Sequence, residues 1–169
     1  MNMDQNRRPQ GNHSFDQPLQ ALRQQHEYVR KLFDRYLNTQ DVEVKKQAGP
    51  EILQQLEMHT ALEEAAFYPA VQKIDASLVD ECEDEHQQAK QMISQLKGMQ
   101  PGDAQCDQMY KELCDAIMHH VQVEEQQLFP KVEQSGIDLR SIGDQMQMFD
   151  ANAVSQQAQA TEQRDATRP

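Results

Sequence analysis

The apolar residues of this chain recur every three or four positions along four separate segments, which is the spacing of one face of an α-helix. The first segment begins near Asp16 and Pro18, an N-cap residue followed by a proline at an early helical position. The third runs from about residue 77 to 97 and ends before Gly98. Its stripe repeats the first stripe 60 positions later, in the pairs Leu19/Val79, Leu22/Cys82, His26/His86, Val29/Ala89, Phe33/Ile93 and Tyr36/Leu96.

The second and fourth segments match in the same way at an offset of 61, in the pairs Ile52/Leu113, Leu56/Ile117, His59/His120, Glu63/Glu124, Tyr68/Phe129 and Pro69/Pro130. We expect the two prolines to mark the ends of their helices. The second helix should begin near Asp41 and be kinked or interrupted at Pro50. The fourth should start after Gly102, with Asp103 as its cap.

This pattern predicts an all-α fold in which a duplicated helix pair forms an up-down-up-down four-helix bundle over residues 17–149. No segment alternates with a period of two, so we expect no sheet. A short fifth C-terminal helix is expected to cover one end of the bundle, with its apolar positions at Leu139, Ile142, Met146 and Phe149. Residues 1–16 are predicted to be a disordered arm, and residues 150–169 a disordered tail rich in Gln and Ala.

Charge and composition exclude several classes of partner. The net charge of −12 disfavours nucleic acid and anionic membranes. No apolar run is long enough to span a membrane, and the N-terminus lacks the apolar core of a secretory signal. The three cysteines form no CxxC pair, which argues against a disulfide framework. We therefore expect a cytoplasmic protein that is a monomer or a weak dimer.

Polar residues interrupt all four apolar stripes at their middle, and this feature predicts a metal site. Residues four apart lie one turn apart on the same helix face, so two His-Glu pairs and two single histidines should meet inside the bundle. Buried carboxylates and imidazoles are costly unless they are paired, and metal cations would compensate them. The predicted metal ligands are His26, His59, Glu63, His86, His120 and Glu124.

Each of these residues also has a plainer interpretation. A lone histidine on an apolar face is more often a core residue, and a single HxxxE motif is more often a surface pair. Two such motifs in register with two further core histidines favour the metal site. His13 falls in the predicted arm, and His119 lies off the stripe, although it is five positions before Glu124. The repeat favours His120 over His119.

Two further groups of residues near these positions have competing interpretations. Glu64 and Glu125 follow the predicted ligands but are rotated by about 100° around the helix, which indicates surface groups or groups that support the ligands. Cys82 lies one turn before His86 and could bind metal. Its repeat partner is Leu22, which favours a small core residue.

The donor set indicates the kind of metal. Four imidazoles and two carboxylates, without thiolate, suit iron best, and manganese or zinc less well. Six protein ligands with only two carboxylates favour two metal ions. If both glutamates bridge and an oxo or hydroxo group also bridges, each ion has five ligands and one open position for a small molecule.

The order H, HxxxE, H, HxxxE resembles that of the hemerythrin-like, or HHE cation-binding, family. The strings "HTALEEAAFYP" and "HVQVEEQQLFP" are similar to that family's second and fourth helices, and "LRQQHEYVRKLF" and "CEDEHQQAKQMI" to its single-histidine helices. The resemblance covers residues 17–149. It implies a non-haem di-iron centre, held by the six residues named above, that binds O2 or related small molecules.

One position departs from the oxygen-carrying members of that family, which have another histidine one turn after the third-helix histidine. Here that residue is Lys90, and its repeat partner is Arg30. We therefore expect peroxide or nitric oxide chemistry, iron handling or redox and oxygen sensing, as in other bacterial members, in preference to reversible oxygen carriage. Iron storage or buffering, repair of iron centres and a weak peroxidase-like or catalase-like activity stay open.

Overall fold

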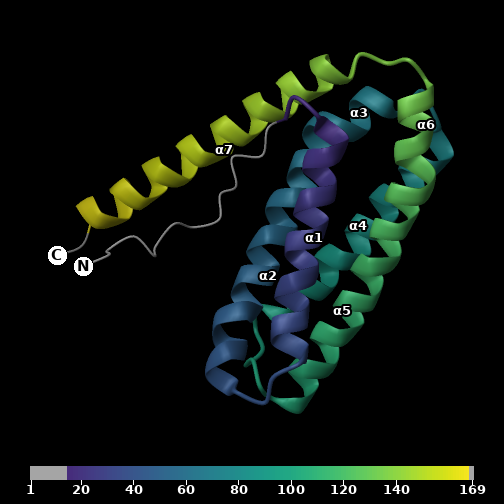
Figure 1. Ribbon diagram of the computed structural model, residues 1–169. Helices are drawn as coiled ribbons and strands as arrows, with labels where there is room; N and C mark the ends of the chain where they lie inside the picture. The colour runs from purple at the N-terminus through teal and green to yellow at the C-terminus, as the bar shows by residue number, and fades with distance from the viewer. Residues whose placement is uncertain (1–14, 168–169) are drawn as a thin grey trace, which may run out of the picture.

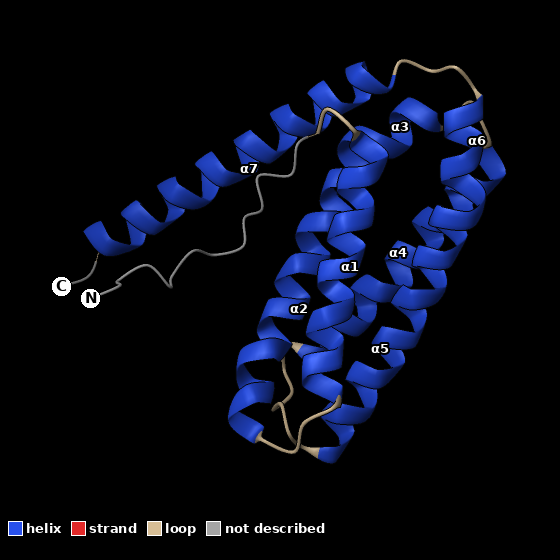
Figure 2. Ribbon diagram, in the orientation of Figure 1, coloured by secondary structure: helices blue, strands red, loops and turns tan. Residues whose placement is uncertain are grey.

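The computed structural model describes residues 15–167 and confirms an all-helical protein, with no strand among these residues (Figure 2). The longest helices of the two repeats are α1 (Pro18–Leu37), α2 (Val42–Leu62), α4 (Ala76–Leu96) and α5 (Ala104–Val123), and they lie alongside one another (Figure 1). Helix α1 packs against α2 and α5, and α4 packs against α5 and α2. All four helices therefore face a common interior.

Aspartates occupy the N-cap positions of α2, α4, α5 and α7 (Leu139–Ala166), and in three of these helices, α5 being the exception, the carboxylate satisfies a backbone N–H group that has no partner within the helix. Asp41 accepts from the N–H of Glu43, and Asp75 from the N–H of Leu78. Asp103 precedes α5, as predicted. The prediction for α1 was wrong by one residue, since Gln17 and not Asp16 occupies the N-cap position.

Pro50 does not interrupt α2, which is continuous from Val42 to Leu62. Gly49, the residue before it, allows the close approach of α5. A Cβ atom at Gly49 would lie 2.8 Å from the Tyr110 hydroxyl. The glycine thus has a packing role at this point in the helix.

The prolines expected to end the second and fourth helices do not end them. Each helix passes through a π-helical turn, η1 (Glu63–Phe67) and η2 (Glu124–Leu128), and then continues as α3 (Tyr68–Val71) and α6 (Phe129–Gln134). The wider turn carries its hydrogen bond from the N–H of Tyr68 to the carbonyl of Glu63, one residue before the proline that has no N–H. Such turns are common at functional sites.

Helix α7 (Leu139–Ala166) is longer than predicted and extends beyond the side of the other helices (Figure 1). Its first half buries Ile142 and Met146, so it covers one end of the bundle as expected. The prediction that the chain is disordered from residue 150 was wrong for residues 150–166, which remain helical although nearly all are exposed. Alanine and glutamine favour helix without supplying an apolar stripe, which explains why the periodicity missed it.

The N-terminal boundary also differs from the prediction. Phe15 is buried, and its carbonyl oxygen lies 1.9 Å from where a Cβ at Gly143 of α7 would be. Only glycine permits this approach, so Phe15, which falls within the predicted arm, packs against α7. The remainder of the predicted arm, residues 1–14, lies outside the described residues.

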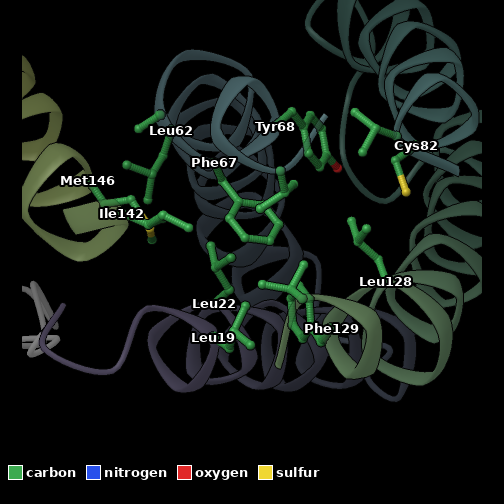
Figure 3. Close-up of a cluster of buried hydrophobic side chains, with 14 of the residues drawn as sticks. Leu19, Leu22, Leu62, Phe67, Tyr68, Cys82, Leu128, Phe129, Ile142 and Met146 are labelled. Atoms are coloured by element: carbon green, nitrogen blue, oxygen red, sulfur yellow. The ribbon is translucent and has the colours of Figure 1, made fainter. Parts of the chain in front are cut away.

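The buried apolar side chains form two clusters, one toward each end of the helices. Ile142 and Met146 of α7 point into the same cluster as Phe67 and Leu22 (Figure 3). The second cluster contains Phe33, Ile52 and Leu113. The polar residues of the four stripes lie between these clusters. No helix among residues 15–167 is long and apolar enough to cross a membrane.

Deleting residues 152–169 should leave the thermal midpoint within about 2 °C of the full chain, because exposed residues contribute little to stability. Deleting residues 139–169 should lower the midpoint much further, because it removes Ile142 and Met146 from the core. Circular dichroism melts of the three proteins test this. A large loss from the shorter deletion would show that the exposed half of α7 stabilises the bundle.

Candidate metal centre

The six predicted ligand residues are all buried at one level between the two apolar clusters. Glu63 and Glu124 have no exposed surface at all. The four histidines are 7% exposed or less. These side chains are His26 from α1, His59 from α2, Glu63 from η1, His86 from α4, His120 from α5 and Glu124 from η2.

The six side chains form two overlapping groups that share both glutamates. One group is His26, His59, Glu63 and Glu124. The other is Glu63, His86, His120 and Glu124. Within each group the nitrogen and oxygen atoms lie within 4.8 Å of one another. Each group can therefore hold a metal ion, with two imidazoles per ion and both carboxylates between the two positions.

The distances follow from the helical spacing and from the contacts between helices. Nε2 of His59 lies 2.7 Å from Oε1 of Glu63, one turn along the same helix. The equivalent distance from His120 to Glu124 is 2.6 Å. Each glutamate also faces an imidazole across the bundle, and the Nε2 of His86 lies 3.5 Å from Oε1 of Glu63. The two HxxxE motifs thus lie in register with the two single histidines.

Each imidazole has an acceptor for its outward-facing nitrogen. The Nδ1–H groups donate to a carboxylate or amide oxygen on a different helical segment, in the pairs His26/Glu125 at 3.2 Å, His59/Gln25 at 2.6 Å, His86/Glu64 at 3.3 Å and His120/Glu85 at 3.3 Å. With the proton assigned to Nδ1, the Nε2 lone pair points into the site. Acceptors of this kind fix the ring orientation and make the inner nitrogen a better metal ligand.

The inner polar atoms fit a cation. All four carboxylate oxygens of Glu63 and Glu124 are buried without a hydrogen-bond partner among the described residues. The Nε2 atoms approach one another to 3.1 Å between His26 and His59. The distance is 3.0 Å between His86 and His120. A positive charge at the two positions would balance the carboxylates and separate the nitrogen lone pairs.

Protons balance part of this charge in the metal-free protein. Burial opposes ionisation of Glu63, but His59 and the other groups around this carboxylate together outweigh burial and hold the pKa of Glu63 well below its usual range. Burial and the charge of Glu63 raise the pKa of Glu124. Burial disfavours protonation of His120, yet the adjacent Glu124 raises the pKa of His120 well above its usual range. A metal binds the same atoms, so metal and protons compete.

Glu64 and Glu125 lie in the π-helical turns and support two of the imidazoles. The sequence indicated surface groups or groups that support the ligands, and the structure places them against His86 and His26 as acceptors. Both members of each Glu-Glu pair therefore take part in the site. Lys90 lies outside the site and pairs with Glu64 at 2.7 Å.

Three supporting residues were not predicted, Gln25, Glu85 and Tyr68. Gln25 and Glu85 occupy the same position of the repeat, which is the signal that could have revealed them. The Tyr68 hydroxyl lies 3.1 Å from Nε2 of His86 and 3.5 Å from Nε2 of His120. Burial raises the pKa of Tyr68, so its hydroxyl is protonated and donates a hydrogen bond into the site.

The remaining candidates lie outside the two groups of four. The His119 side chain is 66% exposed, and its Nε2 lies 3.5 Å from Glu85. Cys82 is a buried core residue, as expected, although its sulfur lies within 4.8 Å of ligand atoms of Glu85 and His120. His13 lies outside the described residues.

A cavity of about 10 Å³ lies against the four imidazoles. This volume is about that of one water-sized molecule. The rest of its wall is mainly apolar, with Val29, Leu56, Ile117 and Val121, and is completed by Gln25 and Thr60. A second, surface pocket of about 340 Å³ lies between α2 and α4, and Thr60 lines both.

Comparisons with known proteins agree with this donor set. A family model described as the hemerythrin HHE cation binding domain matches residues 17–132 and 77–151. A protein of Nostoc sp. (strain PCC 7120 / SAG 25.82 / UTEX 2576) named DNA nickase is 27% identical over 125 residues. The similar region covers 73% of this chain and 36% of that relative, so the chain spans well under half of the relative's length. No solved structure matches the chain significantly.

His59→Ala and Glu124→Ala should each remove most of the bound metal, because each removes a ligand atom from the shared cluster. His119→Ala should retain the metal and serves as the matched control, since it removes an exposed imidazole next to His120. Metal analysis of the purified variants tests this. Normal metal content in His120→Ala together with loss in His119→Ala would show that the wrong histidine has been assigned.

Proposed function

Because this chain belongs to the hemerythrin HHE cation-binding family, we propose that it binds two iron ions and takes up a small molecule at them. The proposed ligands are the six residues of the two overlapping groups. The small molecule is O2, peroxide or nitric oxide, and the role is redox or oxygen sensing or peroxide-related chemistry. Manganese or zinc suits the nitrogen and oxygen donors less well.

The number of metal ions follows from the sharing of the carboxylates. The two groups contain four different imidazoles but the same two glutamates, Glu63 and Glu124. A single ion could not be within bonding distance of all four rings while two ions can each take two. Carboxylates between two cations need no hydrogen-bond donors, which agrees with their lack of partners among the described residues.

The cavity beside the imidazoles is the observation that supports small-ligand binding. Its volume of about 10 Å³ is near the minimum for one water-sized molecule, so it excludes large substrates. Its apolar side chains, Val29, Leu56, Ile117 and Val121, favour a neutral ligand over bulk water. Iron bound here would supply open coordination positions and electrons for such a ligand.

The protein's own residues would orient and protect the reacting centre. The acceptors Glu125, Gln25, Glu64 and Glu85 hold the imidazole rings in place by their Nδ1–H groups. The Tyr68 hydroxyl, 3.1 Å from Nε2 of His86, can donate a hydrogen bond to a group bound nearby. The apolar clusters above and below keep water from the carboxylates.

Reversible oxygen carriage is the less favoured function. The residue one turn after His86 is Lys90, whose ammonium group pairs with Glu64 at 2.7 Å and points away from the site. Both iron positions would then keep exchangeable sites. Iron storage or buffering and repair of iron centres are the alternatives, and they require no cavity next to the imidazoles.

DNA cleavage is not part of this proposal. The similarity to the DNA nickase covers 36% of that protein, and its name describes the whole protein. The present chain carries a net charge of −12, which repels the phosphate backbone. Nothing in the described cluster resembles a site for a polynucleotide, because its ligands lie in the core.

The reduced, iron-loaded protein should oxidise in air in a single irreversible step, because both positions remain exchangeable. Stopped-flow absorption spectra after mixing with O2, and separately with peroxide, test this, with zinc-loaded protein as the control that shows no change. Recovery of the starting spectrum on removal of O2 would indicate a carrier. Insensitivity to both oxidants would favour storage.

Thr60 should control access of the ligand, because it lines both the surface pocket and the cavity. Thr60→Ala should raise the rate of nitric oxide binding to the reduced protein several-fold by opening this path. Thr60→Val keeps the side-chain shape, so it should bind nitric oxide at the rate of the unchanged protein. Equal rates in all three proteins would exclude this route.

A further inference from the structure

The two halves of the centre differ at one pair of residues that support the imidazoles. Gln25 of α1 and Glu85 of α4 occupy matching positions of the repeat. The amide oxygen of Gln25 accepts from Nδ1 of His59 at 2.6 Å. The carboxylate of Glu85 accepts from Nδ1 of His120 at 3.3 Å. One imidazole therefore donates to a neutral group and its counterpart to an anion.

The other two supporting acceptors are alike in the two halves. Glu125 accepts from His26 at 3.2 Å, and Glu64 accepts from His86 at 3.3 Å. Glu64 forms an ion pair with Lys90 at 2.7 Å, whereas Arg23 and Arg30 act on Glu125 only through their charges. Both halves nevertheless have a carboxylate with basic groups nearby at this position, so the pair Gln25/Glu85 is the difference in net charge among the supporting acceptors.

A second difference lies on the same side as Glu85. Tyr68 and Phe129 are equivalent in the repeat. The Phe129 ring is stacked against His26 with a centroid distance of 6.2 Å. The Tyr68 hydroxyl instead lies 3.1 Å from Nε2 of His86. The half that contains His86 and His120 is therefore the more polar and the more negative of the two.

From these differences we propose that the two metal positions are unequal and that the His86/His120 position binds a divalent cation more tightly, with Glu85 as the residue responsible. This inference rests on the proposed two-metal centre. It assigns Glu85 as a positioning residue that acts through His120, and it predicts that a partly loaded protein carries its metal in one defined position.

The physical reason is the charge of the acceptor. A carboxylate that accepts the Nδ1–H of an imidazole makes Nε2 a stronger donor to a metal, and mutation of such residues typically lowers metal affinity about 10- to 100-fold. The Glu85 charge acts on the ring at 3.3 Å, whereas the Gln25 amide has no net charge. Both glutamate ligands are common to the two positions, so they do not cancel this difference.

The experiment uses the full chain, freed of metal and then given Co2+. One equivalent of Co2+ is added before crystallisation, and anomalous scattering gives the occupancy of each position. We expect most of the cobalt at His86/His120. A parallel optical titration gives the two stepwise affinities. Repulsion between two bound ions would separate the two steps even if the positions were identical. The comparison with variants is therefore what tests the inequality.

Two mirror-image variants exchange the supporting groups. Glu85→Gln should weaken the His86/His120 position about 10- to 100-fold and make the two occupancies similar. Gln25→Glu should strengthen the His26/His59 position and also bring the occupancies together. Asp84→Asn, which removes the same charge from an exposed position next to Glu85, should leave the preference unchanged.

The outcomes separate this inference from the proposed function. Equal cobalt occupancy of the two positions after one equivalent of Co2+, with the same occupancies in Glu85→Gln, would overturn the proposed inequality and leave the two-metal centre intact. Preferred filling of His26/His59 would also overturn it. Absence of cobalt from both positions would overturn the proposed centre itself. An equal response to Asp84→Asn would attribute the effect to general surface charge and not to Glu85.

Discussion

The structure depends on the burial of two carboxylates, Glu63 and Glu124, at a level of the core where no described residue donates a hydrogen bond to them. Such groups are strongly destabilising unless a positive charge is close. The surrounding residues are arranged to hold a cation that would supply that charge, with four imidazoles whose inner nitrogens face the carboxylates and whose outer nitrogens are held by acceptors. The apolar clusters on either side keep water away, which strengthens every electrostatic interaction within the site.

The sequence repeat produces this arrangement, because each helix pair contributes one single histidine, one HxxxE motif and a following glutamate. The glutamate that follows the ligand supports an imidazole of the other helix pair, so the two repeats are joined through the centre as well as through the apolar core. Removing one polar residue would therefore leave several others buried without compensation, and such losses exceed those of a typical surface substitution.

The sequence predicted the all-helical fold, the positions of the polar residues and the register of the two repeats, because these follow directly from apolar periodicity. It did not predict that the helices continue past Pro69 and Pro130, since a proline normally ends the hydrogen-bonding pattern. The wider turn avoids this conflict, because its hydrogen bond is donated by Tyr68, the residue before the proline. The exposed half of α7 was missed because alanine and glutamine carry helix propensity but no stripe.

The two π-helical turns occupy equivalent positions of the repeats, Glu63–Phe67 and Glu124–Leu128. A turn of this kind contains one residue more than an α-helical turn, because its hydrogen bonds join residues five apart. Since the turn lies directly after the HxxxE motif in both repeats, each glutamate ligand begins a wider turn at the same level of the core. Exchanging the two repeats would therefore leave the pattern of the cluster unchanged, with one histidine and one HxxxE motif from each helix pair.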